Sequence, residues 1–492
     1  MSSVYLAIDL GATSGRVMAG IVDDQQIKLR EINRFPTKGF EESDSWYWDV
    51  EDIFSHVIEG LRKANVIYGD RIAGIGVDTW GVDYALLDKN GDLLSNPFMY
   101  RDKRTDGIEE RIQKIVSPET IYEETGIQFI FLNSINQLFA EKESRGEELD
   151  QACDLLFMPD LFNYWLCGEK IQERSMASTS QLLNPKTGAW SEILLDALKF
   201  PKHLFKPITE PGRKIGSLLP ELQKRIGAKQ IPVFAVGGHD TASAVAAASL
   251  RADASAFLSS GTWSLMGVES EVPIINQDSL SASFSNEAGV EGTTRFLKNI
   301  CGMWLVELLK EEWQSAGDVL GYDTMVDLAR EAEPFRSIID PDDVSFAKPG
   351  PITDRIQQYC SKNNQPVPES KAQYIRTVFD SLASKSRIVF DQLKLLSGRS
   401  LTELRVVGGG SQNDFLNQCT ANALNCPVHA GPIEATSYGN VLMQLRGAEK
   451  IDSLTSGRQL VVESFSEKLF LPIDPDLWIR PVKFLRELMD LN

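Results

Sequence analysis

The sequence predicts an α/β protein built from two domains, and three observations support this prediction. The chain has 492 residues, more than one hydrophobic core usually serves. Short apolar strands that end at glycine turns alternate with segments whose apolar residues recur at helical spacing. Two strand–glycine–strand stretches, beginning at residues 6 and 256, resemble each other, which indicates a duplicated unit unless the likeness is chance. We expect domains of 1–249 and 250–492 that meet near 245–255.

Strands and one packed helix are expected at the N-terminal end. Residues 4–11 and 15–23 read as a hairpin that closes at a glycine turn. Residues 71–88 repeat the pattern of strand, turn and strand around Trp80 and Gly81. Between these stretches, apolar residues at helical spacing in VEDIFSHVIEGLRKAN predict a helix from residue 50.

The rest of the chain alternates between helical and strand patterns. Residues 106–225 are mostly helical, and KQIPVFAVGG, ending at residue 238, is typical of a buried strand. Residues 254–270 again read as strand, glycine turn and strand. A long helix is expected over 371–397, because Gly398 suits the position after a helix end. Residues 401–424 then predict a strand, a glycine-rich turn and an amphipathic helix.

Composition excludes several classes of function. The chain is 42% hydrophobic and 24% charged, no apolar run approaches the roughly 18 residues of a membrane span, and the N-terminus does not resemble a signal peptide, so we expect a cytoplasmic protein. Its net charge of −19 argues against nucleic-acid binding. The six cysteines form no C-x-x-C pair and the chain has four histidines, which favours reduced thiols over a zinc site.

The turn in DLGATSGR, residues 9–16, has the ingredients of an anion site. Its glycines allow a tight turn whose backbone N–H groups can converge on one point. The residues expected to contact the anion are Ala12, Thr13, Ser14, Gly15 and Arg16. Asp9 would repel a phosphate unless a divalent cation lay between them, so it is a candidate Mg²⁺ ligand through water. A hairpin that Asp9 merely caps is the alternative.

Two later turns could complete a nucleotide site. SSGTWS, residues 259–264, has the same ingredients without an acid, so Gly261 and Thr262 could hold a second phosphate; no Walker A loop is present. VVGGGSQNDFLNQ resembles the opening of a dinucleotide fingerprint, but its glycines, Gly408–Gly410, are consecutive and Asn413 stands where a glycine is required. A base or ribose could lie against this turn and bond to Asn413, or the turn is purely structural.

The stretch VFAVGGHDTASAVAAAS, residues 233–249, places a carboxylate beside two glycines. Gly237 and Gly238 would leave room for a substrate close to Asp240, which begins an expected helix. Phosphoryl transfer to a hydroxyl needs a carboxylate that orients the hydroxyl and takes its proton. Asp240 is therefore a candidate general base and His239 a candidate substrate contact, unless Asp240 is only an N-cap.

Taken in order, several motifs resemble the FGGY family of carbohydrate kinases, within the actin and sugar-kinase superfamily, over essentially the whole chain. They are DLGATSGR, IGVDTWGVD, YRDKRT, GGHDTAS, SSGTWSLMG, LKNICGMWL, VVGGGSQNDFLNQ and EATSYGN. The resemblance implies two ribonuclease-H-like domains with a cleft between them, the sugar on the first and ATP with Mg²⁺ mainly on the second.

The resemblance also implies roles for individual residues. Asp240 matches the general base, Asp9 the acid near Mg²⁺, residues 12–16 the first phosphate loop and Thr262 the second. The further residues matching ATP contacts are Asn299, Gly409 and Gly410. Those matching sugar contacts are Gly81, His239 and Thr241, with Trp80 beside them. The family usually has Gln where this chain has Glu307. A further cluster, either functional or a set of structural salt bridges, is Arg101, Asp102 and Arg104.

Within the family, DTWGVD, HDTASAV and SSGTWSLMG resemble members that phosphorylate L-rhamnulose at its 1-hydroxyl. The same chemistry on L-fuculose or L-xylulose is an alternative, because few contacts read the configuration of one hydroxyl. A non-catalytic actin-like ATP-binding sensor is another, although such a protein would not need Asp240. A nicotinamide-dependent enzyme is disfavoured by the missing third glycine. We expect a small-molecule ketose and ATP as binding partners, and a monomer or homodimer.

Overall fold

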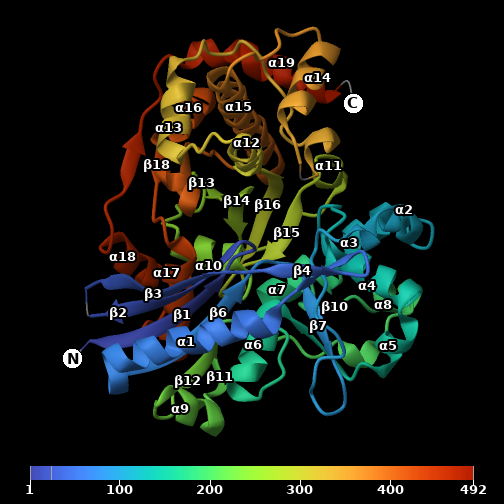
Figure 1. Ribbon diagram of the computed structural model, residues 1–492, viewed down its shortest axis with the longest axis vertical. Coiled ribbons are helices and arrows are strands. Elements are labelled where there is room, and N and C mark those ends of the chain that lie inside the picture. Colours follow the sequence, from blue (N-terminus) through green and yellow to red (C-terminus); the bar gives the residue numbers. More distant parts are fainter. Residues whose placement is uncertain (1, 24, 349, 491–492) are drawn as a thin grey trace. The chain divides into compact units, whose positions relative to one another are not determined.

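The computed structural model describes residues 2–23, 25–348 and 350–490, which form two compact units (Figure 1). Unit 1 contains the described residues of Met1–Ser249, Glu269–Phe296 and Ala435–Phe465. Unit 2 contains those of Leu250–Val268, Leu297–Glu434 and Ser466–Asn492. The predicted α/β fold is confirmed. The expected border at 249/250 is one border between the units, but 269–296 and 435–465, expected in the second domain, pack in unit 1.

The central sheet of unit 1 has the strand order β11-β12-β6-β1-β2-β3. Its strands are β1 (Ser3–Leu10), β2 (Ser14–Val22), β3 (Ile27–Pro36), β6 (Ile72–Thr79), β11 (Arg213–Ser217) and β12 (Pro232–Ala235). Strand β1 pairs antiparallel with β2, which confirms the first hairpin, and parallel with β6. Strands 72–79 and 84–87 form no hairpin, because β7 (Tyr84–Leu87) pairs with β8 (Asp154–Phe157) in a separate sheet.

Helices cover both faces of this sheet. The helices of unit 1 are α1 (Val50–Tyr68), α2 (Ile108–Gln113), α3 (Pro118–Thr125), α4 (Ser134–Ser144), α5 (Gly146–Gln151), α6 (Met158–Cys167), α7 (Arg174–Thr179), α8 (Glu192–Leu198), α9 (Pro220–Ile226), α10 (Asp240–Ala247), α11 (Gln277–Ser281), α17 (Ala435–Gly447) and α18 (Leu454–Val462). Leu6 and Ile8 of β1 pack with apolar residues of α1 and α6. Helix α17 lies on the other face (Figure 1), and its Gln444 Nε2 donates to the carbonyl oxygen of Leu6 at 3.0 Å.

The second sheet has the strand order β15-β16-β14-β13-β17-β18-β19. Its strands are β13 (Ser255–Ser260), β14 (Trp263–Ser270), β15 (Ser285–Ala288), β16 (Thr294–Cys301), β17 (Glu403–Val407), β18 (Val428–Ala430) and β19 (Lys468–Phe470). Strand β13 pairs antiparallel with β14 and parallel with β17. An antiparallel hairpin with a parallel third strand therefore occurs in both sheets, as a duplicated unit requires.

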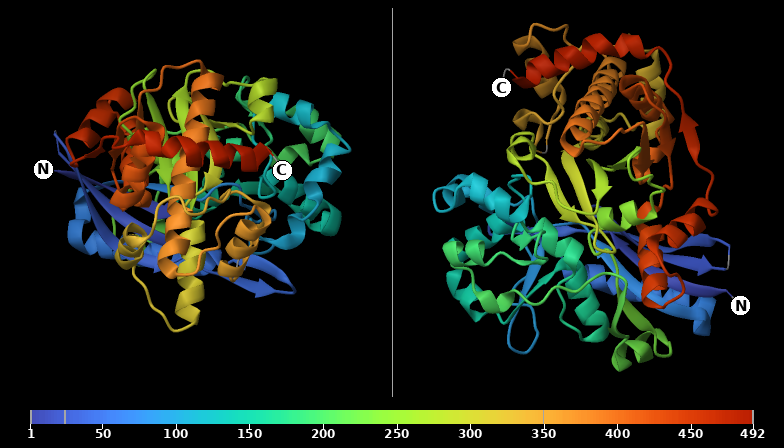
Figure 2. Two further views of the ribbon diagram at one scale, coloured as in Figure 1. Left: turned by 90° about the horizontal axis from the view of Figure 1, so that it is seen from above. Right: turned by 180° about the vertical axis from the view of Figure 1, so that it is seen from behind.

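Unit 2 places one long helix among shorter ones. Its helices are α12 (Trp304–Ser315), α13 (Tyr322–Glu331), α14 (Thr353–Lys362), α15 (Lys371–Ser397), α16 (Asp414–Leu424) and α19 (Ile479–Asp490). Helix α15, orange in Figure 2, has the predicted bounds and ends at Gly398, whose φ of 67° is the left-handed conformation expected there. Across the described residues, no helix combines the length and apolarity that crossing a bilayer needs.

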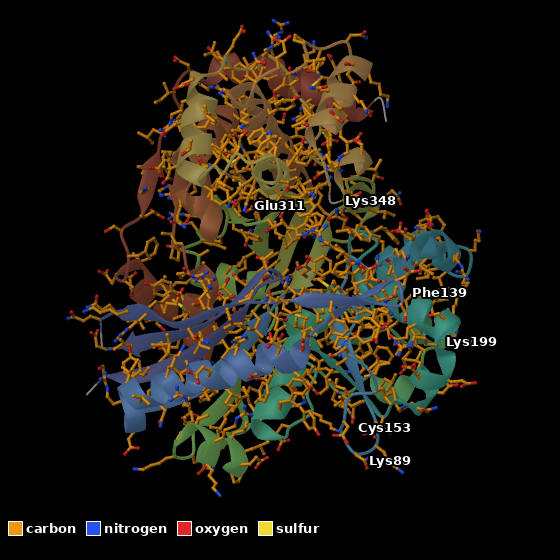
Figure 3. The ribbon with its side chains drawn as sticks, in the orientation of Figure 1. Lys89, Phe139, Cys153, Lys199, Glu311 and Lys348 are labelled. Atoms are coloured by element: carbon orange, nitrogen blue, oxygen red, sulfur yellow. The ribbon has the colours of Figure 1, made fainter. Side chains whose placement is uncertain are left out.

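The cysteines are free thiols. Cys153 is exposed, and it is labelled in Figure 3, whereas the other five are buried. Burial raises the pKa of the Cys419 thiol to about 12, so this side chain behaves as a small apolar residue.

Candidate functional site

Charged side chains form a row across the unit 1 sheet, near the C-terminal ends of β1 and β6. Asp9 lies opposite Arg16 in the antiparallel β1–β2 pair and opposite Asp78 in the parallel β1–β6 pair. Residues paired in this way point to the same face of a sheet. Leu10 points to the opposite face, where it belongs to the apolar core, so the row faces α17.

Asp9 is held firmly in this row. Its side chain is only 6% exposed, and Arg16 Nη2 donates to its Oδ2 at 2.7 Å. The hydroxyl of Ser437, at the start of α17, lies 3.5 Å from the same oxygen. Asp9 therefore does more than cap the hairpin turn, and the guanidinium of Arg16 is directed to Asp9 within the row.

Asp78 is a second acid of the row that sequence reasoning missed. It is fully buried, and Asn440 of α17 donates to its Oδ2 at 2.6 Å. Its Oδ1 has no hydrogen-bond partner among the described residues. Burial, with the charges of Asp9 and Asp240, raises the pKa of Asp78 well above its usual range. The signal was present, because AIDLG and GVDTW place an acid at the same point of two strands that pair in parallel.

The acids of this row fit a magnesium ion. Within the described part of the chain, no cluster of three or more His, Cys, Asp or Glu side chains is arranged to hold a metal ion. Mg²⁺ does not require one, since it is commonly bound through one or two carboxylates together with waters and substrate phosphates. Asp9 and Asp78 supply two adjacent carboxylates, and the buried Oδ1 of Asp78 lacks a hydrogen-bond partner.

Asp240 begins helix α10, as expected, but it is not the helix cap. The capping position belongs to His239, which makes no side-chain capping bond. The Asp240 side chain is 34% exposed. Thr241 Oγ1 donates to Asp240 Oδ1 at 3.0 Å, and His239 Nε2 lies 3.4 Å from the same oxygen. Thr241 and His239 therefore both lie next to the same oxygen of Asp240. This partly exposed carboxylate is at a helix N-terminus, where negative charge is stabilised.

Gly237 and Gly238 do not provide space for a substrate, so that part of the prediction was wrong. A Cβ atom on Gly238 would lie 2.8 Å from Glu173 Oε2, and one on Gly237 would lie 3.0 Å from the backbone nitrogen of Ser243. Protein atoms fill the space beside both residues. The two glycines let the backbone lie close to neighbouring residues just before Asp240.

A buried ionic group lies behind His239. Arg295 Nη2 donates to His239 Nδ1 at 3.2 Å and lies 3.1 Å from Glu287 Oε2. Glu287 Oε2 is also 3.3 Å from His239 Nδ1. Burial lowers the pKa of Arg295, an effect that the neighbouring carboxylates oppose. Sequence reasoning missed both charged residues, because nothing distinguishes them within their strands.

Gly81 lies beside His239, whereas Trp80 is part of the core. A Cβ atom on Gly81 would lie 3.2 Å from His239 Nε2, so these two expected sugar contacts are brought together. Trp80 is 4% exposed and packs on Trp48 with ring centroids 4.1 Å apart. Its Nε1 donates at 2.9 Å to Asp83. Burial raises the pKa of Asp83 to about 6.

The cluster of Arg101, Asp102 and Arg104 makes structural contacts. Asp102 is 2% exposed and accepts from the backbone nitrogens of Trp46, at 2.7 Å, and of Arg104, at 2.9 Å. The guanidinium of Arg104 donates to Gln137 Oε1 at 2.9 Å. Arg101 lies over the Tyr100 ring. Asp102 and Arg104 therefore make structural contacts, as in the salt-bridge alternative to a functional role.

The turn of residues 11–13 between β1 and β2 is fixed by one backbone hydrogen bond and one from a side chain. Gly11 N–H donates to the Ser14 carbonyl at 3.1 Å, and Thr37 Oγ1 donates to the Gly11 carbonyl at 2.7 Å. Ala12 is half-buried and Thr13 is exposed. A Cβ atom on Gly15 would meet the Phe35 ring at 2.5 Å, so a glycine is required there by packing.

The turn between β13 and β14 is held against the start of α12. The Thr262 carbonyl accepts from the backbone nitrogens of Gly302 and Trp304, each at 3.2 Å. Asn299 of β16 is half-buried, three residues before Gly302. Glu307 lies in the first turn of α12, and burial raises the pKa of its carboxyl.

The glycine-rich turn after β17 combines a crowded and an open position. Gly408 has a φ of 84°, and a Cβ atom on Gly410 would overlap the Ser260 side chain. A Cβ atom on Gly409 would meet nothing within 4 Å. Asn413 was expected to bond to a base or ribose, but its Oδ1 accepts from the Leu416 backbone nitrogen at 3.0 Å and so caps α16.

Comparison with known proteins identifies related chains. Residues 4–247 match the N-terminal domain, and residues 256–448 the C-terminal domain, of the FGGY family of carbohydrate kinases. A rhamnulokinase of Bacteroides thetaiotaomicron is 45% identical over 97% of this chain and 98% of its own length. A rhamnulokinase of Bacillus subtilis is 38% identical over 96% of each chain.

A solved structure shares the fold. The crystal structure of a gluconate kinase from Lactobacillus acidophilus superposes with a TM-score of 0.81 over 100% of this chain and 98% of that one, at 16% sequence identity. This likeness establishes the two-domain fold of sugar kinases for the chain and extends no further.

Proposed function

This chain belongs to the FGGY family of carbohydrate kinases, and on that premise we propose that it transfers the γ-phosphoryl group of ATP to the 1-hydroxyl of L-rhamnulose. As a carbohydrate kinase it is an enzyme with a sugar and ATP as substrates. The choice of sugar is supported by relatives named rhamnulokinase that match nearly its full length. The structural observation that carries the chemistry is Asp240, a partly exposed carboxylate at the start of α10.

Asp240 acts as the general base. As its carboxylate takes the proton of the 1-hydroxyl, the hydroxyl oxygen forms a bond to the γ-phosphorus, and the bond from that phosphorus to the bridging oxygen breaks, so that ADP leaves. Gly81, His239 and Thr241 contact the sugar. Trp80 supports Gly81 from within the core rather than touching the sugar, since its indole N–H is engaged by Asp83.

The proposed nucleotide contacts lie in three turns and at Asn299 of β16. The turn of residues 12–16 and the turn at Thr262 contact the phosphates, and Asn299 and the Gly409–Gly410 turn contact the rest of ATP. Asn413 supports that turn through its helix cap. Mg²⁺, which Asp9 and Asp78 would hold, supplies neutralisation of phosphate charge. We also propose a cytoplasmic location and a monomer or homodimer.

A panel of ketoses tests the assignment. L-rhamnulose, L-fuculose and L-xylulose are compared at equal concentrations with coupled detection of ADP, and the phosphorylated carbon is identified by ³¹P NMR. We expect the highest kcat/KM for L-rhamnulose, by about tenfold or more, and a 1-phosphate product. A higher value for another ketose would reassign the sugar, and no stimulation by any ketose would favour a non-catalytic ATP-binding protein.

The glycine-rich turn offers a matched pair of substitutions for the nucleotide contact. Gly409→Ala adds a methyl group to open space, so we expect an unchanged stability. We expect a KM for ATP raised about 5- to 30-fold, since a methyl group on a contact surface costs about 1–2 kcal/mol when it crowds a ligand. Gly410→Ala overlaps Ser260 and is expected to lower the free energy of unfolding by about 1–3 kcal/mol.

Urea unfolding and steady-state kinetics with ATP as the varied substrate check both variants. The sugar KM serves as the internal control for Gly409→Ala, because that position is assigned to the nucleotide alone. An unchanged KM for ATP in a stable Gly409→Ala enzyme would remove Gly409 from the proposed nucleotide contacts.

A further inference from the structure

We propose that Arg295 is a positioning residue that holds the imidazole of His239 as the neutral tautomer with its proton on Nε2. In this tautomer the Nε2–H group is directed to Asp240 and the sugar. The part of the inference that concerns the sugar rests on the proposed function, whereas the tautomer itself does not. All the residues involved belong to unit 1.

Arg295 is rigidly held. Its side chain is 0% exposed. Its Nε and Nη2 both donate to the carbonyl oxygen of Ala288, at 3.1 and 3.0 Å, in the neighbouring strand β15. A guanidinium anchored in this way has little freedom to rotate, so the direction of its remaining N–H groups is fixed by the β15–β16 pair.

The contact between Arg295 and His239 determines which ring nitrogen carries the proton. Arg295 Nη2 donates to His239 Nδ1 at 3.2 Å. A guanidinium has five N–H donors and no acceptor, so Nδ1 must offer its lone pair. A neutral imidazole with an accepting Nδ1 carries its proton on Nε2.

Glu287 would favour the other neutral tautomer of His239, with the proton on Nδ1. Its Oε2 lies 3.3 Å from His239 Nδ1, and a carboxylate facing this nitrogen without Arg295 would favour a proton on Nδ1. The same oxygen lies 3.1 Å from Arg295 Nη2, so the guanidinium offsets the charge of Glu287. Arg295 therefore decides between two tautomers that the site could otherwise hold.

The tautomer has a consequence for the base. His239 Nε2 lies 3.4 Å from Asp240 Oδ1, which also accepts from Thr241 Oγ1. With the proton on Nε2, Oδ1 faces two groups that carry a proton, the Nε2–H and the Thr241 hydroxyl, and Oδ2 is the oxygen that takes the proton of the sugar. With the proton on Nδ1, the lone pair of Nε2 would face a carboxylate oxygen and repel it.

The backbone beside His239 is fixed independently of Arg295. The backbone nitrogen of His239 donates to Ser175 Oγ at 3.0 Å, and that of Gly238 donates to Glu173 Oε2 at 3.0 Å. Removing Arg295 should therefore change the ring and its proton while the main chain keeps its place.

The first experiment reads the tautomer directly. Protein labelled with ring-¹⁵N histidine contains four histidines, and His239→Gln assigns the signal of interest. We expect the wild-type spectrum to show Nδ1 as an acceptor and Nε2 as N–H. Arg295→Met should shift the proton to Nδ1, because the carboxylate of Glu287 faces that nitrogen. Arg295→Lys keeps a donor and should retain much of the wild-type pattern.

Kinetics provide the second readout. In Arg295→Met, kcat/KM for the ketose should fall by about 10–100-fold, with the KM for ATP unchanged, and Arg295→Lys should recover part of the loss. The matched control is Arg458→Met. Arg458 is also largely buried and pairs with Glu269, but it donates to the Val245 and Ala246 carbonyls at the other end of α10, so it should leave the tautomer and the sugar kinetics as they are.

The possible results distinguish the tautomer inference from the proposed function. A wild-type spectrum with the proton on Nδ1, or an Arg295→Met enzyme with unchanged tautomer and sugar kinetics, would overturn the inference. If Arg295→Met does not fold, the wild-type spectrum still tests the inference, because a proton on Nδ1 in that spectrum would overturn it. The expected spectrum in a protein that phosphorylates no ketose would refute the proposed function and leave the tautomer assignment standing.

Discussion

Replacing Asp240 by asparagine is expected to lower kcat for the ketose by about 10²–10⁴-fold, the range that general-base catalysis contributes. The amide cannot take the proton of the 1-hydroxyl. Its oxygen can still accept the hydrogen bond that Thr241 donates to Oδ1, so the variant should fold. ATP binding should be unchanged, because Asp240 is assigned to the sugar side of the reaction.

Steady-state kinetics with coupled ADP detection measure the loss, and calorimetric titration with ATP measures binding. Thr241→Val is the comparison variant, because it keeps the carboxylate and removes the Thr241 hydroxyl, which donates to Asp240 and is a proposed sugar contact. Loss of a hydrogen bond to a charged group costs about 1.5–3 kcal/mol, so this variant should lose roughly 10- to 150-fold, less than Asp240→Asn at the upper end of its range. A kcat for Asp240→Asn within tenfold of the wild type would show that another group serves as the base.

The sequence contained enough local information to predict much of the fold. The hairpin of residues 4–23 follows from an apolar strand, a glycine turn and a return strand. Helix α15 follows from apolar residues at helical spacing and from Gly398 at its end. In both cases the signal lies within a few residues of the feature, so one chain suffices to read it.

What the sequence could not supply is the pairing of distant residues. Asn440 reaches Asp78 across 362 positions, and α17 packs in unit 1 although it follows most of unit 2 in the chain. Arg295 and Glu287 look like ordinary strand residues until the sheet places them behind His239. Strand β7 pairs with β8 rather than β6 for the same reason, because burial and tertiary packing outweigh local pattern.

The candidate site divides along the same line. Asp9 near the end of β1 and Asp240 at the start of α10 could be proposed from the sequence. Each follows from a pattern of a few neighbouring residues. The prediction that Gly237 and Gly238 leave room for a substrate was wrong, because other protein atoms can fill the space that a missing side chain leaves. Here Glu173 and Ser243 occupy that space.

Gly439→Ala is expected to be the most destabilising single methyl addition in unit 1. Helices α10 and α17 lie side by side (Figure 1), and a Cβ atom on Gly439 would overlap the backbone carbonyl of Ser243. Backbone cannot rotate away as a side chain can, so the two helices must separate. Overpacking typically costs about 1–3 kcal/mol and occasionally more, and we expect about 3 kcal/mol or more, against the stabilisation of about 1 kcal/mol that alanine usually gives over glycine in a helix.

The same contact connects packing to catalysis. Helix α10 carries Asp240 at its start, and α17 carries Asn440, which is bonded to Asp78. Separation of the two helices should therefore lower kcat as well as stability in the fraction that folds. Urea unfolding followed by circular dichroism measures the stability. Gly457→Ala on α18 is the control, since its added methyl group meets the ends of the Ile451 and Leu442 side chains, at 2.9 and 3.1 Å, which can move. Equal stability of the two variants would mean that α10 and α17 are not held at this contact, and the row of Asp9 and Asp78 would then need another explanation for its fixed position under α17.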